Sequence, residues 1–157
     1  MTGSPTVEEL AAQEAELVLS RFTNEDAIAL GLALVEVARA ESLPVVVDVR
    51  RGDQVLFHAA LPGTSSTNDA WVERKVRVVR LVGTSSLRAG LEAAAEGSTF
   101  EERQRVDPVL YAAHGGAFPL VVRDVGLVGV VTVSGLPQLE DHALVVRVLR
   151  RFLAESA

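Results

Sequence analysis

The sequence has no cysteine, few aromatic residues and none of the common catalytic fingerprints. Without cysteine there can be no disulfide, thiolate metal site or cysteine nucleophile, which suits a cytoplasmic chain. Aromatic residues make up 4% of the 157 residues. The patterns G-x-G-x-x-G, G-x-x-x-x-G-K-[ST], H-E-x-x-H and G-x-S-x-G do not occur, so the usual nucleotide, zinc-protease and serine-hydrolase signatures are missing. Residue patterns alone therefore assign no reaction and no catalytic residue.

Long apolar runs and a surplus of positive charge are also missing. No uncharged apolar run approaches the roughly 18 residues of a membrane-spanning helix. The first residues lack the basic and apolar regions of a secretory signal peptide, so we expect a cytoplasmic location and no membrane partner. The net charge of -6 argues against nucleic acid as a partner. A mean hydropathy of +0.27 predicts instead a homo-oligomer with a buried apolar interface.

The length and the order of sequence patterns predict one α+β domain. Residues 1–157 are most simply a single domain, with 1–5 as a frayed lead-in. Capping residues predict helices over about 6–20, 23–41 and 139–153, with others starting near Asn68 and Ser85. Two β-branched hairpins are expected, over about 45–58 and 118–133. The order therefore predicts a mostly antiparallel sheet flanked by helices.

The stretch 61–75 predicts a turn that leads into a helix. Pro62-Gly63 ends the preceding strand, and Ser66, Thr67 or Asn68 can cap the helix. Trp71 and Lys75 share a stripe with the apolar residues Val78, Val79 and Val82. Backbone donors beside a tryptophan and a half-buried cation suit an anionic ligand. Two alternatives stay open: Trp71 can be a core residue, and the Lys75 ammonium can reach solvent along the tryptophan.

The three histidines occupy different sequence environments. His142 lies on an apolar helix stripe formed by Val145, Val146, Leu149 and Phe152, so it is either a site residue or a core histidine bonded to a backbone carbonyl. His114 precedes a pair of glycines, where it can end a helix with its charged form stabilised by the helix dipole. His58 closes a strand, and we expect it to be solvated.

A single pocket can explain the polar residues on apolar faces. Unpaired burial of Lys75 or His142 would be costly, so such residues should meet each other or a ligand. We therefore predict that Lys75, His114 and His142 border one cationic pocket at the end of the sheet, and that it prefers carboxylates, phosphates or haem propionates. The alternative is that each residue is satisfied separately. The predicted ligand-binding residues are Asn68, Trp71, Lys75, His114, Gly115, Gly116, Ser134 and His142; no metal site is predicted.

Four motifs in order resemble a known family. They are Leu61-Pro62-Gly63-Thr64 with Asn68, Trp71 and Lys75; Ser85-Ser86; His114-Gly115-Gly116 with Phe118-Pro119; and Val133-Ser134-Gly135-Leu136-Pro137-Gln138 with Asp141-His142. Over roughly residues 43–153 the chain resembles the haem-degrading-domain family of the GlcG/HbpS-like superfamily, in its branch of small single-domain proteins. The resemblance implies a PAS- or profilin-like antiparallel sheet flanked by helices, assembled into homo-oligomers.

The resemblance also suggests ligands. Members of the wider family bind haem or corrinoid-related ligands, so haem is the candidate cofactor. An axial iron ligand would have to be histidine, lysine or oxygen, and few aromatic rings are available to line a porphyrin pocket. Three functions stay open: an oligomeric module that binds a tetrapyrrole or another small anion, a haem-degrading enzyme with His114 or His142 near the iron, and a structural or protein-interaction oligomer.

Overall fold

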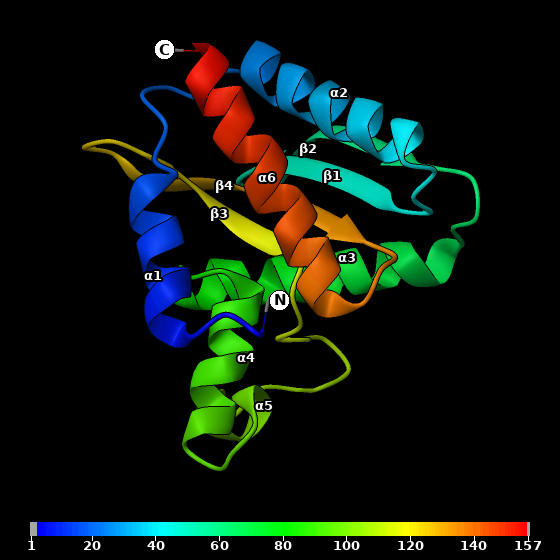
Figure 1. Ribbon diagram of the computed structural model, residues 1–157. Helices are drawn as coiled ribbons and strands as arrows, with labels where there is room; N and C mark the ends of the chain where they lie inside the picture. Colours follow the sequence, from blue (N-terminus) through cyan, green and yellow to red (C-terminus); the bar gives the residue numbers. More distant parts are fainter. Residues whose placement is uncertain (1–2, 157) are drawn as a thin grey trace.

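The computed structural model describes residues 3–156 (Figure 1). It contains a four-stranded antiparallel sheet surrounded by helices. The strands are β1 (Val46–Arg51), β2 (Gln54–Ala60), β3 (Ala117–Val122) and β4 (Gly126–Ser134), in the order β2-β1-β4-β3. The helices are α1 (Val7–Glu16), α2 (Asn24–Ala40), α3 (Ser66–Val82), α4 (Ser86–Ala95), α5 (Phe100–Gln104) and α6 (Gln138–Ser156). The architecture confirms the predicted α+β class with two hairpins.

Alternating side chains divide the sheet into two buried faces. Val47 and Val49 of β1 belong to the large core that α2 and α6 cover. Val46 lies on the opposite face, in a second core with Val72 and Val76 of α3. In Figure 1, α2 and α6 lie together on one side of the sheet and α3 on the other. Polar residues at the even positions of β1 therefore face α3.

Helix starts follow their capping residues, whereas one helix end departs from the sequence pattern. Thr6 and Thr23 each form the predicted capping box, with Glu9 and Asp26 as partners. The first helix ends at Glu16 instead of near Ser20. The reason is a tertiary contact: Leu19 donates its N–H to the carbonyl oxygen of Val121 at 2.8 Å, which extends the sheet beside β3.

The helix α3 begins at Ser66, and its N-cap lies one residue before the first of the three predicted capping residues. Ser65 is its N-cap, and its hydroxyl accepts the N–H of Thr67. Asn68 is the third helical residue, and its Oδ1 accepts the N–H of Ser65 at 2.9 Å. The helix ends at Gly83, whose φ of 78° places it in the left-handed region. Capping residues therefore mark both ends of α3.

Among the described residues, no helix combines the length and the apolar character that crossing a membrane requires.

Candidate functional site

A pocket of about 310 Å³ lies at one end of the sheet, between α3, the loop before β3 and the turn from β4 to α6. Its lining residues are Asn68, Trp71, Lys75, His114, Ser134, Gly135, Leu136, Gln138 and Asp141. Five of the eight predicted ligand-binding residues are thus brought together: Asn68, Trp71, Lys75, His114 and Ser134. The other three, Gly115, Gly116 and His142, do not line the pocket.

A buried ion pair forms the floor of this site. Lys75 is 3% exposed, and its Nζ donates to Asp141 Oδ2 at 3.1 Å and to the carbonyl oxygen of Val133 at 3.3 Å. The Asp141 carboxylate also accepts the N–H groups of Leu136 at 3.0 Å and Gly135 at 3.4 Å. Burial lowers the pKa of Lys75 and raises the pKa of Asp141, because both charges have left water.

This ion pair corrects two expectations about Lys75. Its ammonium does not reach solvent along Trp71, and its charge is compensated by Asp141, so the pocket is less cationic than predicted. Asp141 lines the pocket but is not among the ligand-binding residues predicted from the sequence. A usable signal was present, because Asp141 lies three and four residues before the buried Leu144 and Val145 and so shares their helix face.

The two glycines after His114 allow the backbone to pack closely against neighbouring groups and do not serve to bind a ligand. A Cβ on Gly116 would lie 2.3 Å from the carbonyl oxygen of Val133 and 2.8 Å from Nζ of Lys75. A Cβ on Gly115 would lie 2.3 Å from the carbonyl oxygen of Gln138, and its N–H already donates to Gln138 Oε1 at 2.9 Å. Gly115 and Gly116, which were predicted to bind the ligand, therefore do not line the pocket: both are buried where a loop crosses α6.

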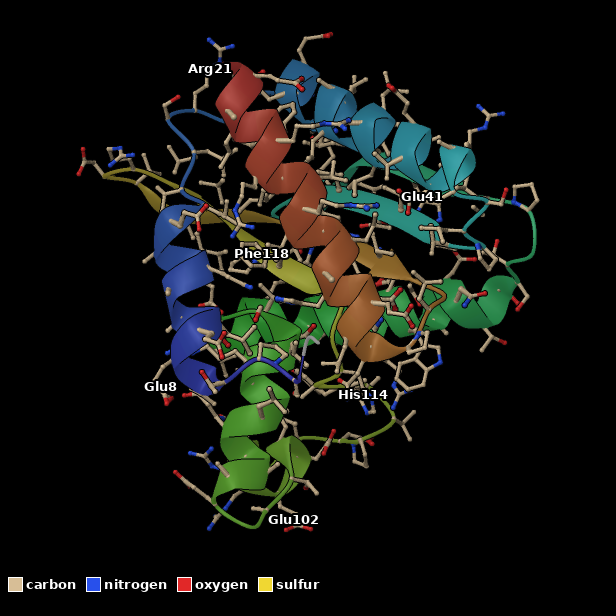
Figure 2. All side chains as sticks on the ribbon, in the orientation of Figure 1. Glu8, Arg21, Glu41, Glu102, His114 and Phe118 are labelled. Carbon is tan, nitrogen blue, oxygen red and sulfur yellow. The ribbon has the colours of Figure 1, made fainter. Side chains whose placement is uncertain are left out.

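Trp71 and His114 form one wall of the pocket. Their rings meet edge to face with centroids 5.2 Å apart, and the guanidinium of Arg74 lies 4.5 Å from the tryptophan ring. Trp71 is half-buried, so it is not the core residue that one interpretation proposed. Figure 2 shows His114 on the loop near the first turn of α6. Partial burial and the positive charges of Lys75 and Arg74 lower the pKa of His114. This shift disfavours the charged ring, whereas the sequence pattern predicted a charged ring stabilised by a helix dipole.

His142 lies outside the pocket. It is 3% exposed, its Nε2 is 2.8 Å from Oε1 of Gln13 on α1, and its ring is 6.0 Å from that of Phe118. Burial lowers the pKa of His142 to about 4. The predicted shared pocket is therefore wrong for His142. Its Nε2 meets a side-chain amide in place of the predicted backbone carbonyl, while its buried Nδ1 has no hydrogen-bond partner among residues 3–156.

The unpartnered polar groups of the pocket are hydrogen-bond donors. A backbone N–H can only donate, so the atoms of Asn68 and Gln138 that face Ser65 and Gly115 are the amide oxygens. Their NH₂ groups and the Trp71 indole N–H have no protein acceptor within residues 3–156. Both Asp141 oxygens are already occupied. The Ser134 hydroxyl and the His114 ring add further donor capacity, so the pocket is suited to a ligand rich in acceptors.

A second charged network links α3 to the β1–β2 hairpin. Arg50 Nε donates to Asp48 at 2.7 Å, and its two terminal nitrogens donate to Glu73 at 3.0 and 2.7 Å. The two ring nitrogens of His58 lie 2.8 Å from oxygens of Asp48 and Asp69. The expectation that His58 is simply solvated was wrong. Burial opposes its charged form, but the hydrogen bonds and charges of both aspartates raise the pKa of His58.

Comparison with known proteins assigns the chain to a family. The model of the family described as "Haem degrading protein HbpS-like" matches residues 22–150. The chain belongs to the HbpS-like family. This HbpS-like chain is 58% identical over 152 residues to a UPF0303 protein of Streptomyces coelicolor, covering 97% of this chain and 96% of the relative. It is 46% identical over 140 residues to a UPF0303 protein of Acidobacterium capsulatum, covering 89% and 85%.

Solved structures agree with the fold. The crystal structure of Ybr137w protein matches the HbpS-like chain with a TM-score of 0.89 and 33% identity, over 98% of this chain and 91% of that one. A crystal structure of HbpS matches with a TM-score of 0.66 at 19% identity, over 85% and 90%. The PduOC–haem complex matches with a TM-score of 0.67 at 18% identity, over 82% and 93%. At these lower identities the likeness shows the fold alone.

Proposed function

We propose that this protein binds a small anionic molecule in the pocket between α3 and α6. The observation that carries the proposal is the donor-rich polar lining: Asn68, Trp71 and Gln138 each offer an unpartnered N–H group, while both Asp141 oxygens are occupied. A carboxylate or phosphate accepts such hydrogen bonds, and bonds to a charged group are the stronger ones. The volume of about 310 Å³ lies at the lower end of small-molecule sites.

The geometry divides recognition between polar and apolar groups. The amides of Asn68 and Gln138 would bind the anionic end, while the Trp71 ring would pack against the body of the ligand. Because Asp141 already neutralises Lys75, selectivity for anions comes mainly from directed donors rather than from net charge.

Haem is the second candidate ligand, and the residues present fit it in part. The His114 ring is exposed at the pocket, has no protein hydrogen bond within residues 3–156, and its lowered pKa keeps it neutral, as an iron ligand must be. His114 would ligate the iron, and the donors of Asn68 and Gln138 would hold a propionate. When bound, haem would supply redox and oxygen chemistry. A pocket of about 310 Å³ encloses only part of a macrocycle.

Amide-to-carboxylate substitutions test the binding mode sharply. Asn68→Asp and Gln138→Glu keep the oxygens that accept the N–H groups of Ser65 and Gly115 but replace the pocket donors with negative charge. Each should weaken binding of a small carboxylate or phosphate at least about tenfold, since a hydrogen bond to a charged group contributes about 1.5–3 kcal/mol. Gln54→Glu on the exposed part of β2 is the matched control and should leave affinity unchanged.

Calorimetry with acetate, pyruvate and inorganic phosphate measures these affinities, and an absorption titration with haem tests the second candidate. Loss of a haem band in His114→Ala with retained carboxylate binding would assign the iron ligand. If neither a carboxylate, phosphate nor haem binds the wild-type protein, the proposed function is wrong.

We also propose that the protein is a homo-oligomer. Large apolar side chains stay exposed on the isolated chain, among them Val109 at 74%, Val125 at 72% and Leu32 at 56%. The loop that carries Val109 is held by Arg74 and Arg77, which donate to the carbonyl oxygens of Pro108 and Leu110. Light scattering should give a mass well above the 16.7 kDa of one chain; a mass of 16.7 kDa would remove this proposal.

A further inference from the structure

The only lysine of this chain lies in the pocket. Of its 15 lysine and arginine residues, the rest are arginine. A guanidinium stays protonated in proteins, whereas a buried lysine can lose its proton and become a nucleophile. Lys75 is thus the single side chain able to offer an amine, and it lies at a pocket whose other free groups suit a carboxylate.

The surroundings of Nζ leave one position open. The nitrogen contacts the carbonyl oxygen of Val133 and Oδ2 of Asp141, and these are its two protein hydrogen bonds within residues 3–156. An ammonium donates two of its three N–H groups to these acceptors, so one direction at Nζ has no protein partner among the described residues. Once a proton has moved to Oδ2, rotation about the Cε–Nζ bond can turn the lone pair of the neutral amine to that open direction. Gly116 keeps this region free of a side chain, because a Cβ there would lie 2.8 Å from Nζ.

Burial shifts the Lys75–Asp141 pair in the direction that a nucleophilic amine requires. The pKa of Lys75 is lowered by burial, against the opposing effect of Asp141, and burial raises the pKa of the Asp141 carboxyl. Both changes favour the neutral pair over the ion pair. A proton can therefore move between Nζ and Oδ2 over 3.1 Å without placing a new unpaired charge in the protein.

We infer that Lys75 forms an imine with the carbonyl carbon of a 2-oxo acid whose carboxylate is held by the donors of Asn68 and Gln138. The inference rests on the proposed function, because the same pocket and donors bind the carboxylate. A 2-oxo acid has its carbonyl next to its carboxylate, so anchoring one end presents the other to a single nucleophile. Simple aldehydes lack the anchored group and should react less readily.

The step is balanced without an oxidant or reductant. The Nζ lone pair forms a bond to the carbonyl carbon, and the carbonyl π electrons move to the oxygen. The protonated Asp141 gives its proton to that oxygen, which becomes a hydroxyl, and the carboxylate so formed takes one proton from the nitrogen. A second proton from nitrogen and the departing hydroxyl leave as one molecule of water. The products are the imine and water, and hydrolysis reverses the reaction.

Reductive trapping tests this inference on the full-length protein. Wild-type protein is incubated with pyruvate or glyoxylate and sodium cyanoborohydride, and peptide mass spectrometry locates the resulting secondary amine. The expected result is saturable labelling of Lys75 that is suppressed by lactate, which has the carboxylate but no carbonyl. Acetaldehyde should label Lys75 more slowly than pyruvate does. The α-amine of the chain is the internal reference amine.

Two variants keep the test specific. Lys75→Arg keeps a cation beside Asp141 and should lose the adduct at position 75 completely. Gln138→Glu keeps Lys75 and the contact to Gly115, and it should slow labelling by the same factor by which it weakens lactate binding. Because this second variant retains the lysine, the inference stays testable even if Lys75→Arg does not fold.

The outcomes separate this inference from the proposed function. If pyruvate and lactate bind but Lys75 is not trapped, the imine is wrong and the anion site stands. If Lys75 is labelled no faster than the N-terminus and without saturation, the reaction is adventitious and the inference is wrong. If no carboxylate binds and nothing is trapped, both the inference and the binding proposal fail.

Discussion

Nζ of Lys75 and Oδ2 of Asp141 lie 3.1 Å apart, and the two residues are 3% and 2% exposed. Removing one member of such a pair leaves the other charge buried and uncompensated. Lys75→Met should therefore lower the free energy of unfolding by about 3–5 kcal/mol. The double variant Lys75→Met/Asp141→Asn should be less destabilised than Lys75→Met alone, because asparagine still accepts the N–H of Leu136.

Urea unfolding of the two single variants and the double variant measures this coupling as a double-mutant cycle. Additive effects of the two substitutions would contradict a coupled ion pair.

His142 should make the protein less stable in acid. Its pKa is about 4 in the folded state and near the ordinary 6.5 when unfolded. Between these values the unfolded state binds more protons, so stability is lost as pH falls from about 6.5 to about 4, by roughly 3 kcal/mol. Denaturant unfolding across this range measures the loss. His142→Gln can still contact Gln13 but does not titrate; if its pH dependence in this interval matches that of wild type, the assignment is wrong.

His58 should have the opposite pH dependence. Its ring nitrogens face Asp48 and Asp69, and because ionised carboxylates only accept, both nitrogens donate and the ring is charged. The folded pKa is raised, so its stabilising contribution is full below the unfolded value of about 6.5 and is lost as pH rises through the folded value. NMR titration of the ring should show the raised pKa, and His58→Gln should remove this part of the pH dependence. A ring pKa at or below 6.5 would contradict the network.

Gly116 should tolerate alanine worse than Gly126 does. Both have positive φ, 137° and 109°, so alanine is strained at either position. Only at Gly116 does the new Cβ also meet the Val133 carbonyl oxygen at 2.3 Å, whereas nothing lies within 4 Å at Gly126. Gly116→Ala should cost about 1–3 kcal/mol more than Gly126→Ala in thermal or urea unfolding, which is the usual cost of overpacking. Equal losses would mean that the loop around Gly116 moves freely.

The sequence predicted the features that depend on near neighbours along the chain. The boxes at Thr6 and Thr23 need only a partner three residues away, and the two hairpins follow from β-branched runs and short turns. Lys75 and His142 were both assigned to the pocket because each interrupts an apolar helix stripe, yet only Lys75 lines it, together with His114. The partners of the polar residues are different: Asp141 lies 66 residues from Lys75, and Gln13 lies 129 residues from His142. Such pairings depend on how α6 crosses the sheet, which no local pattern specifies.

Trp71 should report on the pocket directly. It is the only tryptophan, it is half-buried beside His114, and it lines the cavity, so its fluorescence has a single source. Because the ring is not in the core, Trp71→Ala should cost less than the 3–5 kcal/mol or so of a buried aromatic residue. Acrylamide should quench the wild-type emission, and a bound carboxylate should reduce this quenching by covering the ring. Asn68→Asp should abolish that protection while leaving quenching of the free protein unchanged, because it alters a pocket donor and not the exposure of Trp71. Protection that persists in Asn68→Asp would place the bound anion elsewhere on the protein.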